Sequence, residues 1–177
     1  KPGSVSWGKG FSKIAVNRRA VYYDGSAKMY GKTNLPEFRK LEGIEDHDLN
    51  VLYFWDEHDK LIATCINVSC PAQEVEGRSS INADFWYPVR KELQKTFGEN
   101  LVVLGWIGAA GDMSPHLMYA EAGDDRMRKL RGLSRLDELA RRITEEVIDI
   151  YGVVNFDKHA DVELIHEVRK LQLPRRL

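Results

Sequence analysis

A stretch of nine residues near the middle of the chain, GAAGDMSPH (108–116), combines small residues with three side chains that can do chemistry. Ser114, next to a proline, is a candidate nucleophile on a constrained turn, and His116 is a candidate base. Asp112 is a candidate for orienting a partner or binding a cation. Four small residues open the stretch and leave backbone amides free to point at developing negative charge: Gly108, Ala109, Ala110 and Gly111.

The same stretch has a plainer interpretation as a turn that follows a strand. Asp and Ser side chains in turns commonly hydrogen-bond to their own backbone, and spacing alone favours this interpretation over a catalytic one. The sequence contains no G-x-S-x-G elbow, no H-E-x-x-H helix and no phosphate-binding P-loop.

The segments before this loop predict a strand, a helix and a second strand. LNVLYFW (49–55) and LIATCINVS (61–69) are rich in β-forming residues and are joined by DEHDK, which predicts a hairpin. Apolar residues spaced by four predict a helix over 84–97, with Asn82 or Asp84 as its cap. The continuous apolar run 101–107 is typical of a strand covered on both faces.

This order predicts a βαβ crossover made of strand 61–69, helix 84–97 and strand 101–107. Its two strands run parallel, so their carboxyl ends lie at one edge of the sheet, where α/β proteins bind ligands. The loops that leave this edge are 69–80 and 108–116. The predicted fold class is α/β, with a mixed sheet that contains a parallel βαβ unit flanked by helices, plus a β-hairpin.

The remaining elements are a strand within 13–23, a helix over 134–151 and a last strand over 162–173. Ser134 and Asp137 form a plausible capping box for the helix, and Gly152 is expected to stop it. The last strand is expected from alternating apolar and polar residues. The basic run RMRKLR (126–131) is interpreted as a solvated face flanking a helix.

Composition sets the broad class of the protein. With 177 residues, 43% of them hydrophobic and a formal net charge of −1, the chain is expected to form a single α/β domain over 1–177. Interleaved charges give no reason to expect nucleic acid or a membrane surface as a partner. No apolar stretch approaches the ~18 residues that span a bilayer. Because the chain begins at Lys1, it is expected to be a trimmed piece of a larger protein.

The two cysteines, Cys65 and Cys70, are expected to remain unpaired. Along an extended run their Cα atoms would lie about 16 Å apart, which is too far for a disulfide. Cys70, at the end of a strand, is a candidate metal ligand or nucleophile, although a lone thiol is more often a small buried hydrophobe.

The succession LIATCINVSC, INADFWYPVRKEL and VVLGWIGAAGDMSPH resembles the core of the neutral/alkaline ceramidase family. The likeness is most specific at Gly111-Asp112-Met113-Ser114-Pro115, and NRR (17–19) and LQLPRR resemble segments that flank this core. The resemblance implies a secreted, periplasmic or membrane-associated zinc amidase that cleaves the N-acyl bond of a lipid-like substrate, with Ser114 in the active site.

The resemblance also places Cys70 at the family's zinc-binding histidine. It therefore implies a zinc site with Cys70 as one ligand and the other ligands outside this chain. Two further hypotheses stay open: a non-catalytic ligand-binding or partner-binding domain that has lost the metal, and a hydrolase that uses Asp112 with Glu74 or Glu76.

Overall fold

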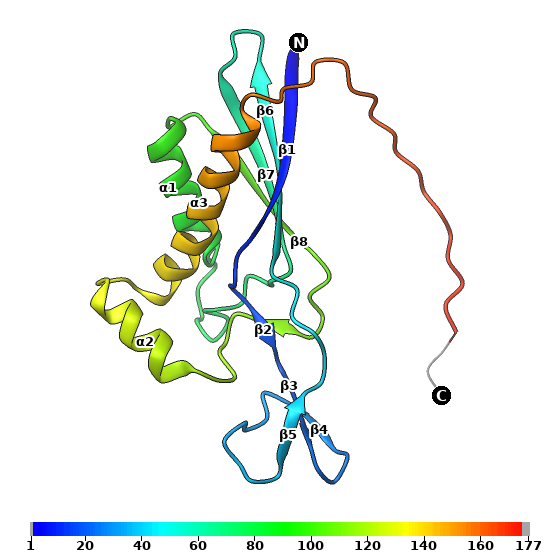
Figure 1. The fold of residues 1–177 in the computed structure, drawn as a ribbon, viewed down its shortest axis with the longest axis vertical. Coiled ribbons are helices and arrows are strands. Elements are labelled where there is room, and N and C mark those ends of the chain that lie inside the picture. Colours follow the sequence, from blue (N-terminus) through cyan, green and yellow to red (C-terminus); the bar gives the residue numbers. More distant parts are fainter. Residues whose placement is uncertain (1, 175–177) are drawn as a thin grey trace.

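The computed structural model describes residues 2–174, and its largest sheet has four strands in the order β1-β6-β7-β8. Strand β1 (Gly3–Phe11) pairs antiparallel with β6 (Asp48–Asp56), and β6 pairs antiparallel with β7 (Leu61–Val68) in the predicted hairpin. Strand β8 (Val102–Ile107) runs parallel to β7. The mixed α/β fold and its parallel βαβ unit are thus confirmed (Figure 1).

Buried and more exposed side chains alternate along the strands, and this alternation identifies the buried face of the sheet. In β6 the side chains of Leu49, Val51, Tyr53 and Trp55 are buried, and those between them are more exposed. Helices α1 (Trp86–Phe97) and α3 (Arg135–Val154) lie on the buried side (Figure 1). Burying a large apolar side chain contributes about 1.5–3 kcal/mol, so the core lies between these helices and one face of the sheet.

The predicted helices are present, with differences at their ends. The capping box of Ser134 and Asp137 is confirmed in α3, but the helix continues through Gly152 to Val154. The predicted cap of α1 was wrong, because Phe85 occupies the cap position and its side chain makes no capping hydrogen bond. Asp84 instead accepts from the amide of Phe85 at 2.8 Å and from that of Val75 at 2.9 Å. It therefore ties the loop after β7 to the start of α1.

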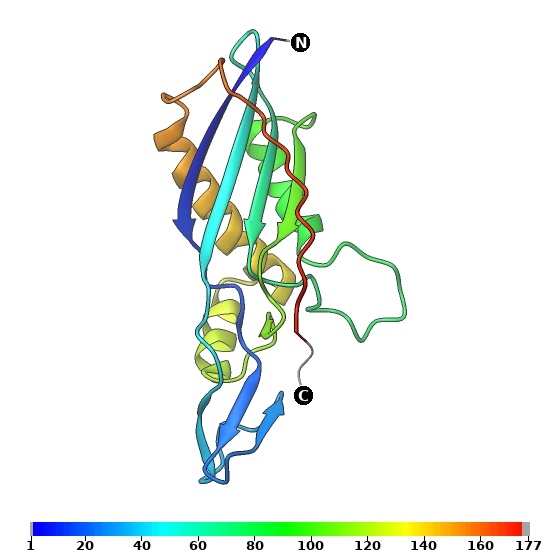
Figure 2. The same ribbon diagram turned by 90° about the vertical axis from the view of Figure 1, so that its right-hand side faces the viewer.

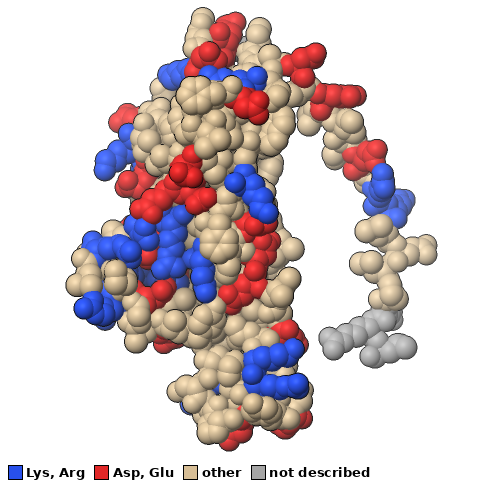
Figure 3. All heavy atoms as spheres, viewed as in Figure 1, with Lys and Arg blue, Asp and Glu red and all other residues tan. Residues whose placement is uncertain are grey.

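The basic run 126–131 was expected to flank a helix, but most of it lies within helix α2 (Glu121–Leu130). Lys and Arg side chains gather over this part of the surface beside acidic ones (Figure 3). Next to it, the carboxylate of Glu138 is buried on α3, and hydrogen bonds from Arg141 and Arg142 lower its pKa to about 2. The charges here form a paired network. Within the described residues no helix is both long and apolar enough to cross a membrane.

Two small sheets form beyond the carboxyl end of β7. The predicted strand 13–23 is divided into β2 (Val16–Asn17), which pairs with β9 (Met113–Ser114), and β3 (Arg19–Tyr22). Strand β3 pairs on its two sides with β4 (Ala27–Met29) and β5 (Phe38–Leu41). This three-stranded sheet forms an arm that extends from the end of the molecule (Figure 2).

The predicted strand over 162–173 is not formed. The described residues beyond Asp161 have no strand pairing, and their side chains are exposed. Alternation by itself does not make a strand, because the backbone needs a partner for its hydrogen bonds. Among the described residues, one isolated antiparallel bridge, between Val5 and His159, joins the backbone after α3 to the sheet.

Gly105 of β8 lies directly under Trp86 of α1, and this close contact sets the distance between helix and strand. A Cβ atom at Gly105 would lie 2.4 Å from the indole ring. We therefore expect Gly105→Ala to lower the free energy of unfolding by about 1–3 kcal/mol through overpacking. Gly152→Ala is the matched control: it meets open space in a helix and should stabilise by about 0.5–1 kcal/mol. Urea titration measures both, and equal effects would contradict this account.

Candidate functional site

The parallel pair β7–β8 brings the two predicted loops to one edge of the sheet. The amide of Gly108 donates to the carbonyl of Val68 at 2.8 Å, which extends the ladder to the point where both loops leave. A Cβ atom at Gly108 would lie 2.7 Å from Ser69 Oγ. Glycine is needed here because the two chains approach so closely.

The start of the chain holds the 108–116 loop from its other side. Strand β2 pairs with β9, so that Val16 lies opposite Ser114 and Asn17 opposite Met113. The buried Asn17 side chain donates to Asp112 Oδ2 at 2.7 Å, and the Arg18 amide donates to the Asp112 carbonyl at 2.8 Å. Asp112 therefore fixes this turn to the β2 segment.

Ser114 lies where three segments meet, and its side chain is fully buried. Its Oγ atom lies 3.2 Å from the Tyr30 hydroxyl and accepts from the Gln73 amide nitrogen at 3.2 Å. It also accepts from the backbone amide of His116 at 3.1 Å. The last bond is the side chain to backbone bond that the plainer turn interpretation predicts. We call Ser114, Tyr30, Gln73 and His116 the Ser114 corner.

The imidazole of His116 has partners other than Ser114. Its Nε2 atom lies 2.9 Å from the backbone oxygen of Gln73 and 3.4 Å from Glu76 Oε1. The ring meets the Tyr30 ring edge-on, with 5.9 Å between centroids. His116 thus joins the 69–80 loop to the 108–116 loop, and its imidazole would have to turn before it could take a proton from Ser114.

Sequence reasoning missed Tyr30, Gln73 and Arg18, although the structure places all three at or beside the corner. Arg18 donates to the Tyr30 hydroxyl at 3.2 Å and to the carbonyl of Gly111 at 2.9 Å. Gln73 donates to the same hydroxyl at 2.7 Å. The NRR segment was noticed only for its resemblance. Tyr30 lies in a region broken by glycines, where no pattern indicated a chemical role.

The other predicted residues of the loop have different surroundings. The Gly108 amide donates to the carbonyl of Val68 in the sheet. The backbone amides of Ala109, Ala110 and Gly111 donate no hydrogen bond to another described residue. Asp112, Glu74 and Glu76 have separate partners: Asn17, Arg135 and His116, respectively. Burial raises the pKa of Glu74, and Arg135 opposes that rise.

Cys70 is close in sequence to the corner but is part of the core. Its side chain is 1% exposed, and its sulfur lies 3.8 Å from the carbonyl oxygen of Ile14. Burial, together with the charges of Asp84 and Glu74, raises the pKa of the thiol well above its usual range. The predicted meeting of the two loops is confirmed, but Gln73 rather than Cys70 makes the contact with Ser114.

These surroundings do not fit a zinc ion. Zinc binds the thiolate form of cysteine and is held by three or four ligands, whereas burial favours the neutral thiol of Cys70. Among residues 2–174 no group of three His, Cys, Asp or Glu side chains is placed to hold a metal. The donor set found here therefore supplies no zinc site of its own.

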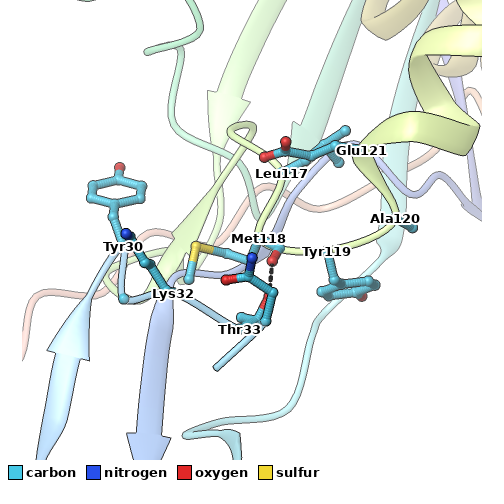
Figure 4. A pocket seen from close by; sticks show the side chains of 10 residues that line it. Tyr30, Lys32, Thr33, Leu117, Met118, Tyr119, Ala120 and Glu121 are labelled. Carbon is cyan, nitrogen blue, oxygen red and sulfur yellow. Dashed lines mark hydrogen bonds between the residues drawn. The ribbon is translucent and has the colours of Figure 1, made fainter. Parts of the chain in front are cut away.

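Two cavities reach the Ser114 corner. One of about 490 Å³ lies between Tyr30–Asn34 and Leu117–Glu121, where Thr33 donates to the carbonyl of Met118 (Figure 4). Another, of about 510 Å³, is lined by His116, Glu74 and Arg135 among others. Ser114 itself lines neither cavity and is fully buried, so its hydroxyl is covered in this conformation.

Comparison with known proteins finds similarity in fold only. No protein-family model matches the sequence, and no curated protein matches it. The solved structure of neutral ceramidase from Pseudomonas aeruginosa matches with a TM-score of 0.59 and 17% identity, over 86% of this chain and 23% of that chain. The structure of a ceramidase complexed with C2 matches with a TM-score of 0.58 and 16% identity, over the same shares of the two chains. The chain thus has the fold of part of a ceramidase and spans about a quarter of the length of these structures.

We expect Asn17→Ala to destabilise the protein and to loosen the 108–116 loop. The substitution leaves the Asp112 carboxylate without its donor, and a lost partner in such a setting costs about 1–3 kcal/mol. Asn34→Ala, at an exposed position, is the control and should change stability by about 0.5 kcal/mol or less. Urea titration gives the stability, and hydrogen exchange of residues 109–114 gives the loop opening. Unchanged exchange in Asn17→Ala would contradict the anchoring role.

We expect zinc content to be independent of Cys70. Purified wild-type chain and Cys70→Ala should both contain well below one zinc ion per chain after dialysis, because the thiol is buried and un-ionised. Elemental analysis by mass spectrometry measures this. One zinc per wild-type chain that is lost in Cys70→Ala would overturn the assignment of Cys70 to the core.

Proposed function

We propose that this chain is part of a ceramidase-like hydrolase and that its Ser114 corner cleaves the N-acyl amide bond of a lipid-like substrate. The main observation is that Ser114 lies beside the 69–80 loop, with the Tyr30 hydroxyl, the Gln73 side-chain amide and the His116 backbone amide within hydrogen-bond distance of its Oγ atom, on a fold like part of neutral ceramidases. Ligand sites of α/β sheets lie at this edge. The domain boundaries 1–177 and the larger parent protein belong to the same proposal.

In the proposed reaction the Oγ atom of Ser114 attacks the carbonyl carbon of the amide. The Ser114 proton passes to the His116 imidazole, and the free amides of Ala109, Ala110 and Gly111 supply donors for the oxyanion. The C–N bond then breaks, and the amine leaves with the proton from His116. Water hydrolyses the acyl-serine to the free acid, so that the sum is one amide and one water to one acid and one amine.

Ser114 must be uncovered before it can react. Tyr30 and Gln73 cover it, and both belong to segments outside the main sheet: the arm that carries β3–β5 and the 69–80 loop. A movement of the arm would open the path from the 490 Å³ cavity to Ser114 and free the His116 ring to turn. Loop closure over a reactive group is a common way to exclude water.

The runner-up proposal is a non-catalytic domain that binds a ligand or partner. Two observations favour it: Cys70 is a buried core residue at the position of the family's zinc ligand, and Ser114 is covered. Zinc stays a prediction from the resemblance, and the chemistry proposed above uses none.

Ser114→Ala tests the proposal. Wild-type chain is incubated with a long-chain N-acyl amine, and the released amine is measured by mass spectrometry. We expect turnover in the wild type and a loss of about three orders of magnitude or more in Ser114→Ala, since that is the scale seen when a serine nucleophile is removed. Ser79→Ala, in the exposed part of the neighbouring loop, should keep the wild-type rate.

Binding of the same amide is measured in parallel by calorimetry. Equal turnover in wild type and Ser114→Ala would overturn the role of Ser114. Binding by both proteins without turnover by either would support the non-catalytic domain instead.

A further inference from the structure

One face of the main sheet carries apolar side chains that no helix within residues 2–174 covers. Helices α1 and α3 pack on the opposite face (Figure 1). Pairing across the four strands places two consecutive apolar rows on the uncovered side: Val5, Phe54, Ala63 and Val102 in one, Trp7, Leu52, Cys65 and Leu104 in the next. We call these two rows the open face. Trp7, Val102 and Leu104 are 51%, 62% and 44% exposed.

The chain after α3 carries a second set of exposed apolar side chains. Six of them lie within twelve residues: Val162, Leu164, Ile165, Val168, Leu171 and Leu173. This segment, 162–173, has the alternating pattern of a half-buried strand but no partner. Figure 2 shows it on the side of the sheet away from the helices, and Figure 1 shows that beyond its first residues it runs at a distance from the sheet. The chain thus has two exposed apolar surfaces on the same side of the sheet.

The segment is already attached beside the open face at its first residues. Val5 and His159 exchange two backbone hydrogen bonds of 2.9 Å, and the imidazole of His159 stacks on Trp7 with 4.8 Å between centroids. Because Val5 and Trp7 both belong to the open face, these contacts place His159 beside the two apolar rows, at the β1 edge of the sheet.

A groove already joins the two surfaces. It has a volume of about 680 Å³, and its lining combines Val162 and Leu164 with Leu52 and Phe54 of the open face. Four strands span about 14 Å, and twelve extended residues reach about 40 Å. The segment is therefore long enough to cross both rows from its attachment at β1.

We propose that segment 162–173 docks on the open face of its own chain as an extended strap, with Val162, Leu164 and Val168 directed toward the two apolar rows. This inference concerns the face of the sheet away from the helices and does not depend on the proposed hydrolase activity. The segment is the occupant that the structure favours, because its tethered end and the groove place Val162 and Leu164 on the same side of the sheet as Leu52 and Phe54.

The rate at which the Cys65 thiol reacts with a labelling reagent reports whether the segment is docked. Cys65 lies in the second apolar row and is half-buried, whereas the only other cysteine, Cys70, is fully buried in the core. The full chain is labelled with a thiol reagent under native conditions, and the rate at Cys65 is followed by peptide mass spectrometry. Cys70 reports any global unfolding in the same sample.

Two triple variants are compared with the wild type. V162S/L164S/V168S removes the apolar contacts of the strap, and E163S/E167S/R169S changes the intervening positions as a matched control. We expect Cys65 to react about tenfold faster or more in the first variant, since a local opening exposes it, and at the wild-type rate in the second. Labelling of Cys70 should stay slow in all three proteins, because the strap lies outside the helical core.

Equal labelling of Cys65 in the wild type and both variants would overturn the proposal. So would a wild-type dimer in light scattering that becomes monomeric in V162S/L164S/V168S, because the segment would then cover a second copy. Faster labelling of Cys65 in the first variant alone, with all three proteins monomeric, supports an intramolecular strap.

Discussion

The parallel pairing of β7 with β8 fixes where the two loops of the candidate site meet. Six residues of each strand are paired in register, from Ala63 with Val102 to Val68 with Ile107. Since α1 crosses between them, both chains leave the sheet at the same edge. The bond from Gly108 to Val68 and the missing side chain at Gly108 let the two loops start in contact. The positions of Gln73, Ser114 and His116 all depend on this geometry.

The start of the chain completes the corner from the other side. Strand β2 lies against the turn that carries Ser114, and the arm beyond it brings Tyr30 over the hydroxyl. Arg18 connects these parts through Tyr30 and the carbonyl of Gly111. The site is thus built between a rigid sheet edge and a small sheet with little core of its own, so movement of the arm is the natural route to opening.

Cys70 separates this chain from the zinc chemistry that the sequence resemblance implies. The Cys70 thiol is buried in the core next to Ile14 and Pro71, where it packs as a small apolar side chain. The same burial raises its pKa. In this setting Cys70 offers a zinc ion no thiolate, the form of cysteine that zinc binds.

Local patterns in the sequence were sufficient to predict the hairpin, the crossover and the capped helix α3. The alternation of apolar residues, their spacing by four and the Ser134 capping box each act over only a few residues. The parallel geometry then predicted that the 69–80 and 108–116 loops meet. Only tertiary structure decided that Gln73 and Tyr30, not Cys70, contact Ser114, that β2 pairs with β9, and that 162–173 forms no strand. Those outcomes depend on contacts between residues far apart in the chain, and a strand exists only where another backbone accepts and donates its hydrogen bonds.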